Sequence, residues 1–233
     1  IITPEYGWKW VNDEMEGFSS RGQDPYEMDE DQIAYCREHI FPYWAGKSAE
    51  DIFLARVPEE TRTIGVDTGF IDTDSKWRNG IGEITPDYID QIFPKGYSGI
   101  KTEAIERMSK LDQANPEDSP KITFYQSMIL VADGMISLGE RYRVKALEMA
   151  AAESDPVRRS ELETIASVCG NVPANPPQSF HEAIQFAWFV ELAGIISENP
   201  LALNVGRFDQ FMYPYYKKDK DAGIIDHDTA LEL

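Results

Sequence analysis

The longest regular pattern in the chain runs from Ser119 to about Glu153. Apolar residues recur within it at a period near 3.6, at Ile122, Ile129, Leu130, Ile136 and Leu147. This period is that of an α-helix with one apolar side, so the stretch predicts a single long helix. Strand signals are few and short by comparison, around Ile64–Val66 and in Leu201–Val205. We therefore expect a mostly helical chain.

Helix start and stop signals predict two further helices downstream. Asp155 is a typical N-cap, Pro156 follows at the first helical position, and Gly170 is a residue on which such a helix can end. Ser179 and Glu182 have the spacing of a capping box, in which the two side chains satisfy free backbone N–H groups at the start of a helix. We expect a helix after each of these starts.

Similar signals mark the first half of the chain. Residues 24–44 begin with an acidic turn and continue with apolar residues at helical spacing, and we expect that helix to stop before Pro42. Thr85 has the position of a cap and Pro86 that of a first helical residue. An amphipathic helix is expected over residues 98–111.

Composition excludes some classes of function. The 233 residues are 42% hydrophobic, which allows a sizeable core. They carry 41 acidic and 22 basic residues, a net charge of −19, and nucleic-acid binding needs a dense cationic face instead. The sequence has no long uncharged apolar run and no basic leader, so we expect a cytoplasmic protein with no membrane span.

The two ends of the sequence are unusual for a whole protein. The chain begins at Ile1 without a methionine and ends soon after Asp228, which has the position of a helix cap. A helix of one or two turns is not stable alone. We therefore expect these 233 residues to be a piece of a longer polypeptide.

Residue types that bind metals or act as nucleophiles occur without the spacing that their chemistry needs. His181 and Glu182 are consecutive, as in a zinc-protease helix, but Gln185 stands where the second histidine would be, so no metal site is predicted. Cys36 lies on the apolar side of a predicted helix, and Cys169 precedes a helix end. Both are interpreted as structural.

Two segments lack a simple helical explanation. Glu83 lies in a glycine-flanked loop just before a predicted helix, and two interpretations remain open: an exposed carboxylate, or a pocket residue held by a rigid loop. Residues 204–216 pack three tyrosines around Gly206 and Pro214. Tyrosine rings offer wide amphipathic faces, so this stretch predicts a packing centre and not a reacting group.

Three motifs resemble one family of enzymes. VPANPPQSFHEAIQ (172–185), GRFDQFMYPYYKKD (206–219) and GEITPDYIDQIFPKGYSGI (82–100) are similar to the N-terminal part of the glycyl radical enzymes, the pyruvate formate-lyase superfamily. The resemblance covers essentially the whole chain. It implies that residues 1–233 are the N-terminal part of a single domain, a mostly α segment of an α/β ten-stranded barrel, with outer helices and a few barrel strands.

The resemblance also implies a reaction and its partners. In that family an activase that uses S-adenosylmethionine and an iron–sulfur cluster makes a glycyl radical, which passes to a cysteine. The cysteine thiyl then takes hydrogen from a small-molecule substrate. The Gly-Cys-x-Glu loop and the C-terminal glycine loop are both absent from 1–233, so no catalytic residue, bound cofactor or turnover is expected of this chain alone. The resemblance suggests a homodimer, and some branches carry small accessory subunits.

The branch of the family bears on the substrate. Pro200 to Leu203 would form an apolar wall, which suits an aryl or alkyl substrate better than a polyol, and residues 65–88 look most like the fumarate-adding benzylsuccinate and alkylsuccinate synthases. Candidate partners for the carboxylates of fumarate are Arg78 and Arg207. The candidate pocket residues are Glu83, Trp77, Asn199, Leu201, Ala202 and Leu203.

Three alternatives remain open. Within the family, the chain could belong to an arylacetate decarboxylase, or to a dehydratase-type lyase in which Glu83 accepts a hydroxyl proton. Outside it, composition alone also allows a non-catalytic helical interaction module. Loops bearing the radical cysteine and glycine in the longer sequence would separate an enzyme from such a module.

Overall fold

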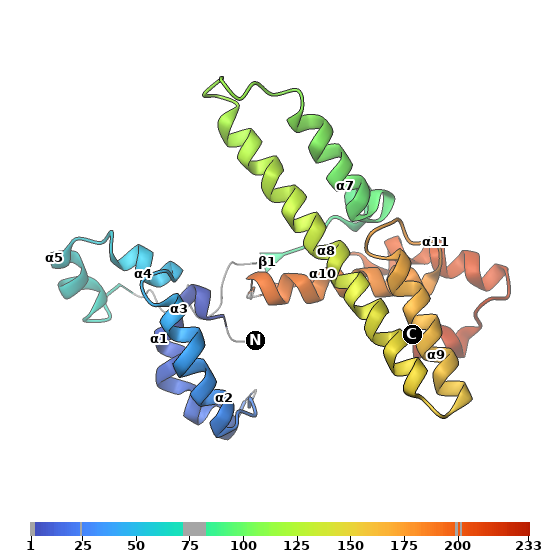
Figure 1. Cartoon of the computed structure of the whole chain (residues 1–233), viewed down its shortest axis with the longest axis horizontal. Coiled ribbons are helices and arrows are strands. Elements are labelled where there is room, and N and C mark those ends of the chain that lie inside the picture. The colour runs from blue at the N-terminus through green and yellow to red at the C-terminus, as the bar shows by residue number, and fades with distance from the viewer. Residues whose placement is uncertain (1–2, 24, 72–82, 199, 201) are drawn as a thin grey trace. The chain divides into compact units, whose positions relative to one another are not determined.

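The computed structural model describes residues 3–23, 25–71, 83–198, 200 and 202–233, and these are mostly helical (Figure 1). The first part of the chain contains α1 (Pro4–Glu14), the 3-10 helix η1 (Met15–Ser20), α2 (Glu30–Tyr35), the π-helical η2 (Cys36–Ile40), α3 (Phe41–Trp44), α4 (Ala49–Leu54), α5 (Glu59–Thr61) and the π-helical η3 (Arg62–Val66). The second part contains β1 (Glu83–Ile84), the π-helical η4 (Tyr88–Ile92), α7 (Phe93–Met108), α8 (Ser119–Ala152), α9 (Pro156–Asn171), α10 (Phe180–Glu198), β2 (Ala202–Leu203), α11 (Phe208–Asp221) and α12 (His227–Glu232). The expectation of a mostly helical chain is confirmed.

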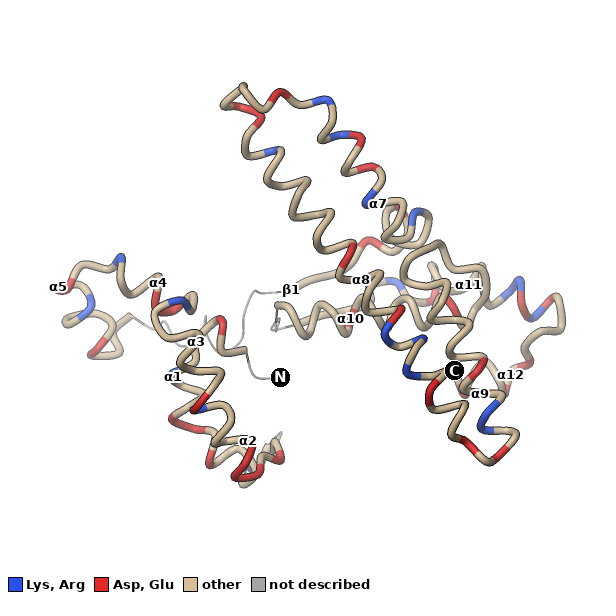
Figure 2. Tube along the Cα trace, in the orientation of Figure 1, with Lys and Arg blue, Asp and Glu red and all other residues tan. Residues whose placement is uncertain are grey.

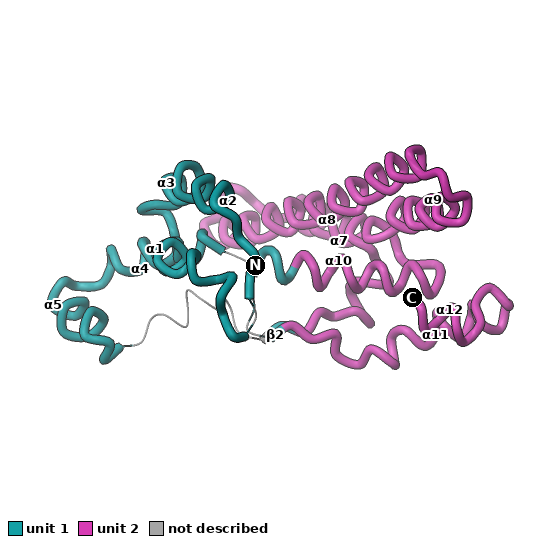
Figure 3. The backbone as a smooth tube through the Cα atoms, turned by 90° about the horizontal axis from the view of Figure 1, so that it is seen from below, with its two compact units in different colours: residues 1–84, 194–202 teal, residues 85–193, 203–233 magenta. Residues whose placement is uncertain are grey.

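The chain divides into two compact units (Figure 3). Unit 1 contains residues 1–84 and 194–202, and unit 2 contains residues 85–193 and 203–233. The long helix α10 therefore begins in unit 2 and ends in unit 1. Each unit has a hydrophobic core of its own.

The core of unit 1 is small and lies where α1 meets α3. Val11, Met15, Phe18 and Phe41 are buried in it, and the rings of Trp8 and Phe41 lie 5.9 Å apart. Burial of apolar side chains on helices this short provides most of their stability, because isolated helices of one or two turns do not form in water.

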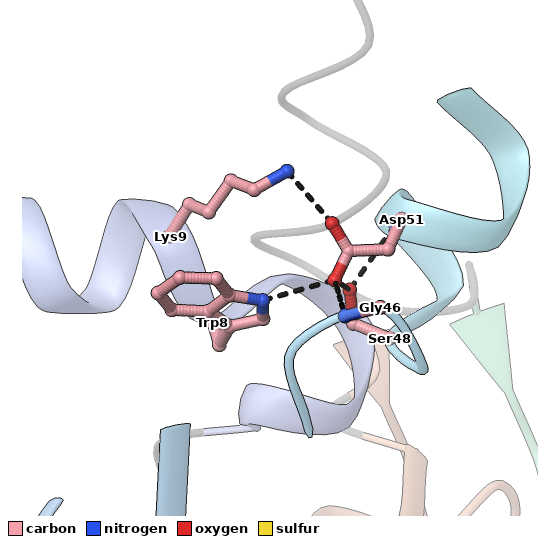
Figure 4. Close-up of polar contacts among 5 residues, drawn as sticks. All are labelled: Trp8, Lys9, Gly46, Ser48 and Asp51. Atoms are coloured by element: carbon pink, nitrogen blue, oxygen red, sulfur yellow. Dashed lines mark hydrogen bonds and ion pairs between the residues drawn. The ribbon is translucent and has the colours of Figure 1, made fainter. Parts of the chain in front are cut away.

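Asp51 at the start of α4 ties that helix to α1 (Figure 4). Its carboxylate accepts hydrogen bonds from Lys9 Nζ at 2.7 Å, and from Trp8 Nε1, Gly46 N and Ser48 Oγ at 2.9 Å each. Burial alone would raise the pKa of the Asp51 carboxyl, but these four donors outweigh it and lower the pKa to about 2. The charged carboxylate is thus the form that unit 1 stabilises.

Unit 2 is built around α8, which packs against α7 and α9. Small residues dominate its buried side, which consists of Ala132, Met135, Gly139, Ala146 and Ala150. A Cβ at Gly139 would lie 2.5 Å from Pro173 Cδ and 2.9 Å from the Val172 carbonyl oxygen, so only glycine permits this approach. The segment at Val172 and Pro173, which connects α9 to α10, therefore lies directly against α8.

Among the described residues, α8 alone is long and apolar enough to cross a membrane. Its most apolar part has a mean hydropathy of 1.2 and is 17% buried. Asp133 interrupts the apolar residues of α8, so no long uncharged run marks this helix in the sequence. One helix of this kind is weak evidence for a membrane span, and α8 packs against α7 and α9.

Several helix boundaries differ from those predicted. The helix that begins at α2 does not stop before Pro42 but continues to Trp44. Phe41 N bonds to Cys36 O, five residues back, so the chain passes through a π-helical turn and Pro42 falls in the first turn of α3. A proline is tolerated there because no backbone N–H is needed.

Four further expectations on local structure need correction. Residues 62–66 form the π-helical η3 and not a strand. Asp87, not Thr85, caps η4, because its side chain accepts from Asp90 N at 3.0 Å. Asp226, not Asp228, caps α12, and α9 ends at Asn171, one residue beyond Gly170. In the last three cases a neighbouring residue takes the predicted place, and local propensity does not fix helix ends to a single residue.

Candidate functional site

The candidate pocket residues that the structure describes meet on two paired strands. Glu83 is in β1 and Ala202 and Leu203 are in β2, and β1 and β2 form a two-stranded sheet. Ala202 and Leu203 are both partly buried. The strand predicted near Leu201–Val205 is therefore confirmed, and residues more than a hundred positions apart in sequence become neighbours. Three other candidates, Trp77, Asn199 and Leu201, lie outside the described residues.

The segment that follows β1 is fixed by Tyr88. Its hydroxyl donates a hydrogen bond to Glu191 Oε1 on α10 at 2.7 Å, and its ring stacks on Phe211 of α11 at 4.6 Å. Burial, together with the hydrogen bond and charge of Glu191, raises the pKa of the Tyr88 hydroxyl far above its ordinary value. Tyr88 is therefore a neutral donor at any physiological pH.

Tyr88 belongs to a group of rings that we call the aromatic cluster: Tyr88, Phe93, Phe186, Phe211 and Tyr215. Its rings come from the motifs at 82–100 and 206–219, and from Phe186, which directly follows the motif at 172–185. Phe93 is its centre, 5.3 Å from Phe186, 5.5 Å from Phe211 and 5.7 Å from Tyr215. Edge-to-face and offset contacts at these distances are favourable beyond the area that they bury. The tyrosine-rich stretch after Gly206 is thus a packing centre, as predicted.

The segment that follows β2 lies against the segment that follows β1. Gly206 has φ of +68°, and a Cβ there would lie 3.1 Å from Thr85 Cγ2. Asn204 Oδ1 accepts from Gly206 N at 3.0 Å and so holds the turn. Glycine suits this position both for its backbone conformation and for the close approach.

Two side chains bind the backbone N–H groups at the start of α10. One precedes the helix in the sequence and the other follows it. Ser179 Oγ accepts from Glu182 N at 3.2 Å, which is half of the predicted capping box. Glu182 Oε2 accepts from Gln178 N at 2.6 Å instead of closing the other half on Ser179. Another free donor at this helix start, Phe180 N, bonds to Asp219 Oδ2 on α11 at 2.7 Å.

Asp219 was not identified from the sequence. It is only 2% exposed, and a buried carboxylate that accepts from a helix N-terminus combines a charged hydrogen bond with a favourable dipole. The one sequence signal is an acidic residue at the end of an otherwise aromatic and basic stretch, and nothing local indicates its partner.

The other polar residues considered from the sequence do not form a second site among the residues that the structure describes. Cys169 is buried, which raises the pKa of its thiol to about 11, and burial also raises that of Cys36. Burial lowers the pKa of His181. Arg207 is exposed, and Arg78 lies outside the described residues. No group of three metal-binding side chains occurs in the described part of the chain.

Comparison with known proteins places the chain in a family. The whole of residues 1–233 matches the model of the "Pyruvate formate lyase-like" family, and the chain belongs to that family. Isethionate sulfite-lyase of Oleidesulfovibrio alaskensis is 33% identical over all of this chain, which covers 29% of that protein. Trans-4-hydroxy-L-proline dehydratase of Clostridioides difficile is 32% identical over 95% of this chain and 28% of its own length. Indoleacetate decarboxylase of Tractidigestivibacter scatoligenes is 30% identical over 59% of this chain and 16% of its own.

Solved structures show the same fold. The glycerol-bound B12-independent glycerol dehydratase from Clostridium butyricum has a TM-score of 0.84 and 32% identity over 98% of this chain. A glycyl radical enzyme from Archaeoglobus fulgidus has a TM-score of 0.81 and 29% identity over all of it. The chain covers 28% and 29% of those two chains. The family predicted from the motifs is confirmed, and the chain spans less than a third of the length of these relatives.

The fumarate-adding branch finds no support in these comparisons. The relatives above are named as a sulfite-lyase, dehydratases and a decarboxylase. That branch was inferred from residues 65–88, of which 72–82 lie outside the described part of the chain. These comparisons favour the alternative of a dehydratase-type lyase over fumarate addition.

Proposed function

We propose that the chain is the N-terminal portion of a glycyl radical enzyme that eliminates a small leaving group from an organic substrate. The similarity to a sulfite-lyase and a dehydratase over 95–100% of the chain is the observation that carries this proposal. Both names describe the loss of a small group, sulfite or water. All 233 residues would then belong to one pyruvate formate-lyase-like domain, whose radical-bearing loops lie outside them.

Glu83 is the residue of this chain that we assign to the chemistry. The family's thiyl radical supplies hydrogen abstraction, and Glu83 would accept the proton of a substrate hydroxyl. A carboxylate can do this when it is held within hydrogen-bond reach by a rigid support. Pairing of β1 with β2, together with the fixing of the next segment through Tyr88 and Gly206, supports such a position.

The other candidate pocket residues are proposed to line the site beside Glu83. Ala202 and Leu203, with Leu201, would present an apolar wall, and Trp77 and Asn199 would complete it. Such a wall favours a substrate with an alkyl or aryl part, because each unpaired hydroxyl of a polyol would cost roughly 1–3 kcal/mol there.

The family membership also implies partners for the whole enzyme. We propose activation by an S-adenosylmethionine and iron–sulfur activase, a homodimer of the large subunit and a cytoplasmic location. We propose neither nucleic acid nor a membrane as a partner. The net charge of −19 argues against nucleic acid. Accessory subunits are proposed only if fumarate addition is found.

An anaerobic assay of the full-length activated protein tests the reaction. The substrates are isethionate, a hydroxyproline, 1,2-propanediol, indoleacetate, and toluene with fumarate. We expect an elimination product from one of the first three. A succinate adduct alone would restore the fumarate-adding branch and overturn our proposal. Indoleacetate consumption would favour the decarboxylase, which the shorter match over 59% of the chain supports less well.

Substitution of Glu83 tests its role. Glu83→Gln keeps the size of the side chain but removes the proton acceptor, so kcat should fall by roughly 10²–10⁴-fold with little change in KM. Glu106→Gln on α7 is the matched control, because Glu106 is exposed and far along the chain from β1. An unchanged kcat in Glu83→Gln would remove this residue from the mechanism.

A further inference from the structure

Glu191 is the one charged residue in the apolar middle of α10. Between residues 183 and 197 this helix carries no other Asp, Glu, Lys or Arg (Figure 2). The preceding Val190 is buried and Glu191 itself is partly buried, and a charged group in such surroundings is costly unless it is hydrogen-bonded. Its partner is the Tyr88 hydroxyl, which donates to Glu191 Oε1 at 2.7 Å and also lies 3.5 Å from the Ala187 carbonyl oxygen. The contact with Tyr88 therefore accounts for a carboxylate at this position.

The π-helical turn η4 is what directs Tyr88 toward α10. Phe93 N bonds to Tyr88 O, five residues back. In an α-helix, side chains five residues apart point about 140° away from each other, and the wider π turn reduces this angle. The rings of Tyr88 and Phe93 consequently lie 5.4 Å apart, and both contact α10, Tyr88 at Glu191 and Phe93 at Phe186. Single π turns of this kind are uncommon and are frequent at functional sites.

The Tyr88–Glu191 hydrogen bond lies close in sequence to the proposed proton acceptor. Tyr88 follows Glu83 by only five positions, and Pro86 between them restricts the backbone. At one end of this short segment β1 pairs with β2, and at the other end Tyr88 is bonded to α10. A change in the position of Tyr88 is therefore passed on to β1, because so few residues cannot absorb it.

We infer that Tyr88 and Glu191 are positioning residues for the elimination reaction, and that their hydrogen bond holds β1 where Glu83 can reach the hydroxyl of the substrate. The inference rests on the role proposed for Glu83. Neither Tyr88 nor Glu191 touches the substrate, and both act through the backbone of residues 83–88. Proton transfer requires a donor and an acceptor within hydrogen-bond reach, so a small displacement of β1 is enough to slow it.

Substitutions in the full-length activated enzyme test this inference. Tyr88→Phe keeps the ring in the aromatic cluster but removes the donor, so kcat should fall on the order of 10- to 100-fold with little change in KM. Glu191→Leu should cause a similar loss. Glu191→Gln keeps an acceptor oxygen for Tyr88 and should retain most of kcat. Tyr215→Phe is the matched control, because it removes a hydroxyl from the same cluster and leaves the Tyr88–Glu191 hydrogen bond in place.

Two further measurements separate positioning from a purely structural role. If Tyr88 acts through Glu83, Tyr88→Phe should lower kcat in the wild-type enzyme but not further in the Glu83→Gln variant, because the group that it positions is already lost. Amide hydrogen exchange across residues 83–85 requires no turnover. It should be faster in Tyr88→Phe than in Tyr215→Phe, since β1 would open more readily.

The outcomes that overturn the inference differ from those that overturn the proposed function. A normal kcat in Tyr88→Phe together with a large loss in Glu83→Gln refutes the inference alone. An equal loss from Tyr88→Phe with and without Glu83→Gln also refutes it, as does an equal loss in Tyr215→Phe. Full activity of Glu83→Gln refutes the function assigned to that residue. If no elimination product forms, faster exchange across residues 83–85 still shows that Tyr88 holds β1, and unchanged exchange shows that it does not.

Discussion

At the scale of single residues, two buried or partly buried carboxylates hold this chain together. Asp51 joins α4 to α1 in unit 1, and Asp219 joins α11 to α10 in unit 2. Each accepts hydrogen bonds from donors about forty residues away in sequence. A carboxylate can satisfy several donors at once, which makes it an efficient link between short helices.

The low pKa of Asp51 predicts an acid-sensitive contribution to stability. Because the folded value of about 2 lies below the ordinary value of 3.8, the charged form stabilises the folded chain above about pH 4, and this contribution is lost as the pH falls toward 2. Asp51→Asn should cost about 1–2 kcal/mol at pH 7, because half-exposed Lys9 is partly screened, and much less near pH 2. Urea unfolding at both pH values measures this, with exposed Glu38→Gln as control. An equal loss at both pH values would contradict it.

At the scale of elements, the three family motifs serve one purpose in unit 2. Two of them supply four of the five rings of the aromatic cluster, the third supplies the start of α10, and α10 leads to β2. The stretch after Gly206 therefore acts as a support for the segments next to both strands. This explains why so many half-polar aromatic residues occur in α11.

The link between α11 and α10 can be tested directly. Asp219→Ala leaves the buried N–H of Phe180 without an acceptor, so the free energy of unfolding should fall by roughly 1–3 kcal/mol. Asp219→Asn keeps an acceptor oxygen and should cost less. The urea midpoint measures stability, and amide exchange at Phe180 should quicken in the alanine variant. Asp221→Ala, at an exposed position of the same helix, is the control. Equal effects at positions 219 and 221 would argue against the link.

At the scale of the whole molecule, the chain belongs to the pyruvate formate lyase-like family, and the sulfite-lyase and the hydroxyproline dehydratase to which it is similar are more than three times its length. The exposed surface of the chain agrees with its being part of a longer protein, because large apolar side chains are exposed in both units. Examples are Ile64 and Phe70 in unit 1, and Leu130 and Trp188 in unit 2. Such surfaces are normally interfaces.

The absence of both radical loops from the sequence leads to a prediction for the isolated chain. Treatment of the 233-residue chain with the activase should give no glycyl radical signal by electron paramagnetic resonance and no turnover, whereas the full-length protein should give both. The full-length protein in the same reaction is the positive control. A radical signal from the isolated chain would mean that a glycine within 1–233 is the radical site.

The sequence by itself determined the helices and the family. Helix periodicity and caps are local properties, so α8, α9 and the start of α10 could be predicted from neighbouring residues, as could the family from three long motifs. Pairing of β1 with β2, the Tyr88–Glu191 hydrogen bond and the partners of Asp51 and Asp219 were decided only by the tertiary structure. These contacts join segments 39 to more than 100 positions apart, and no local pattern specifies which distant donor a carboxylate or strand edge will meet.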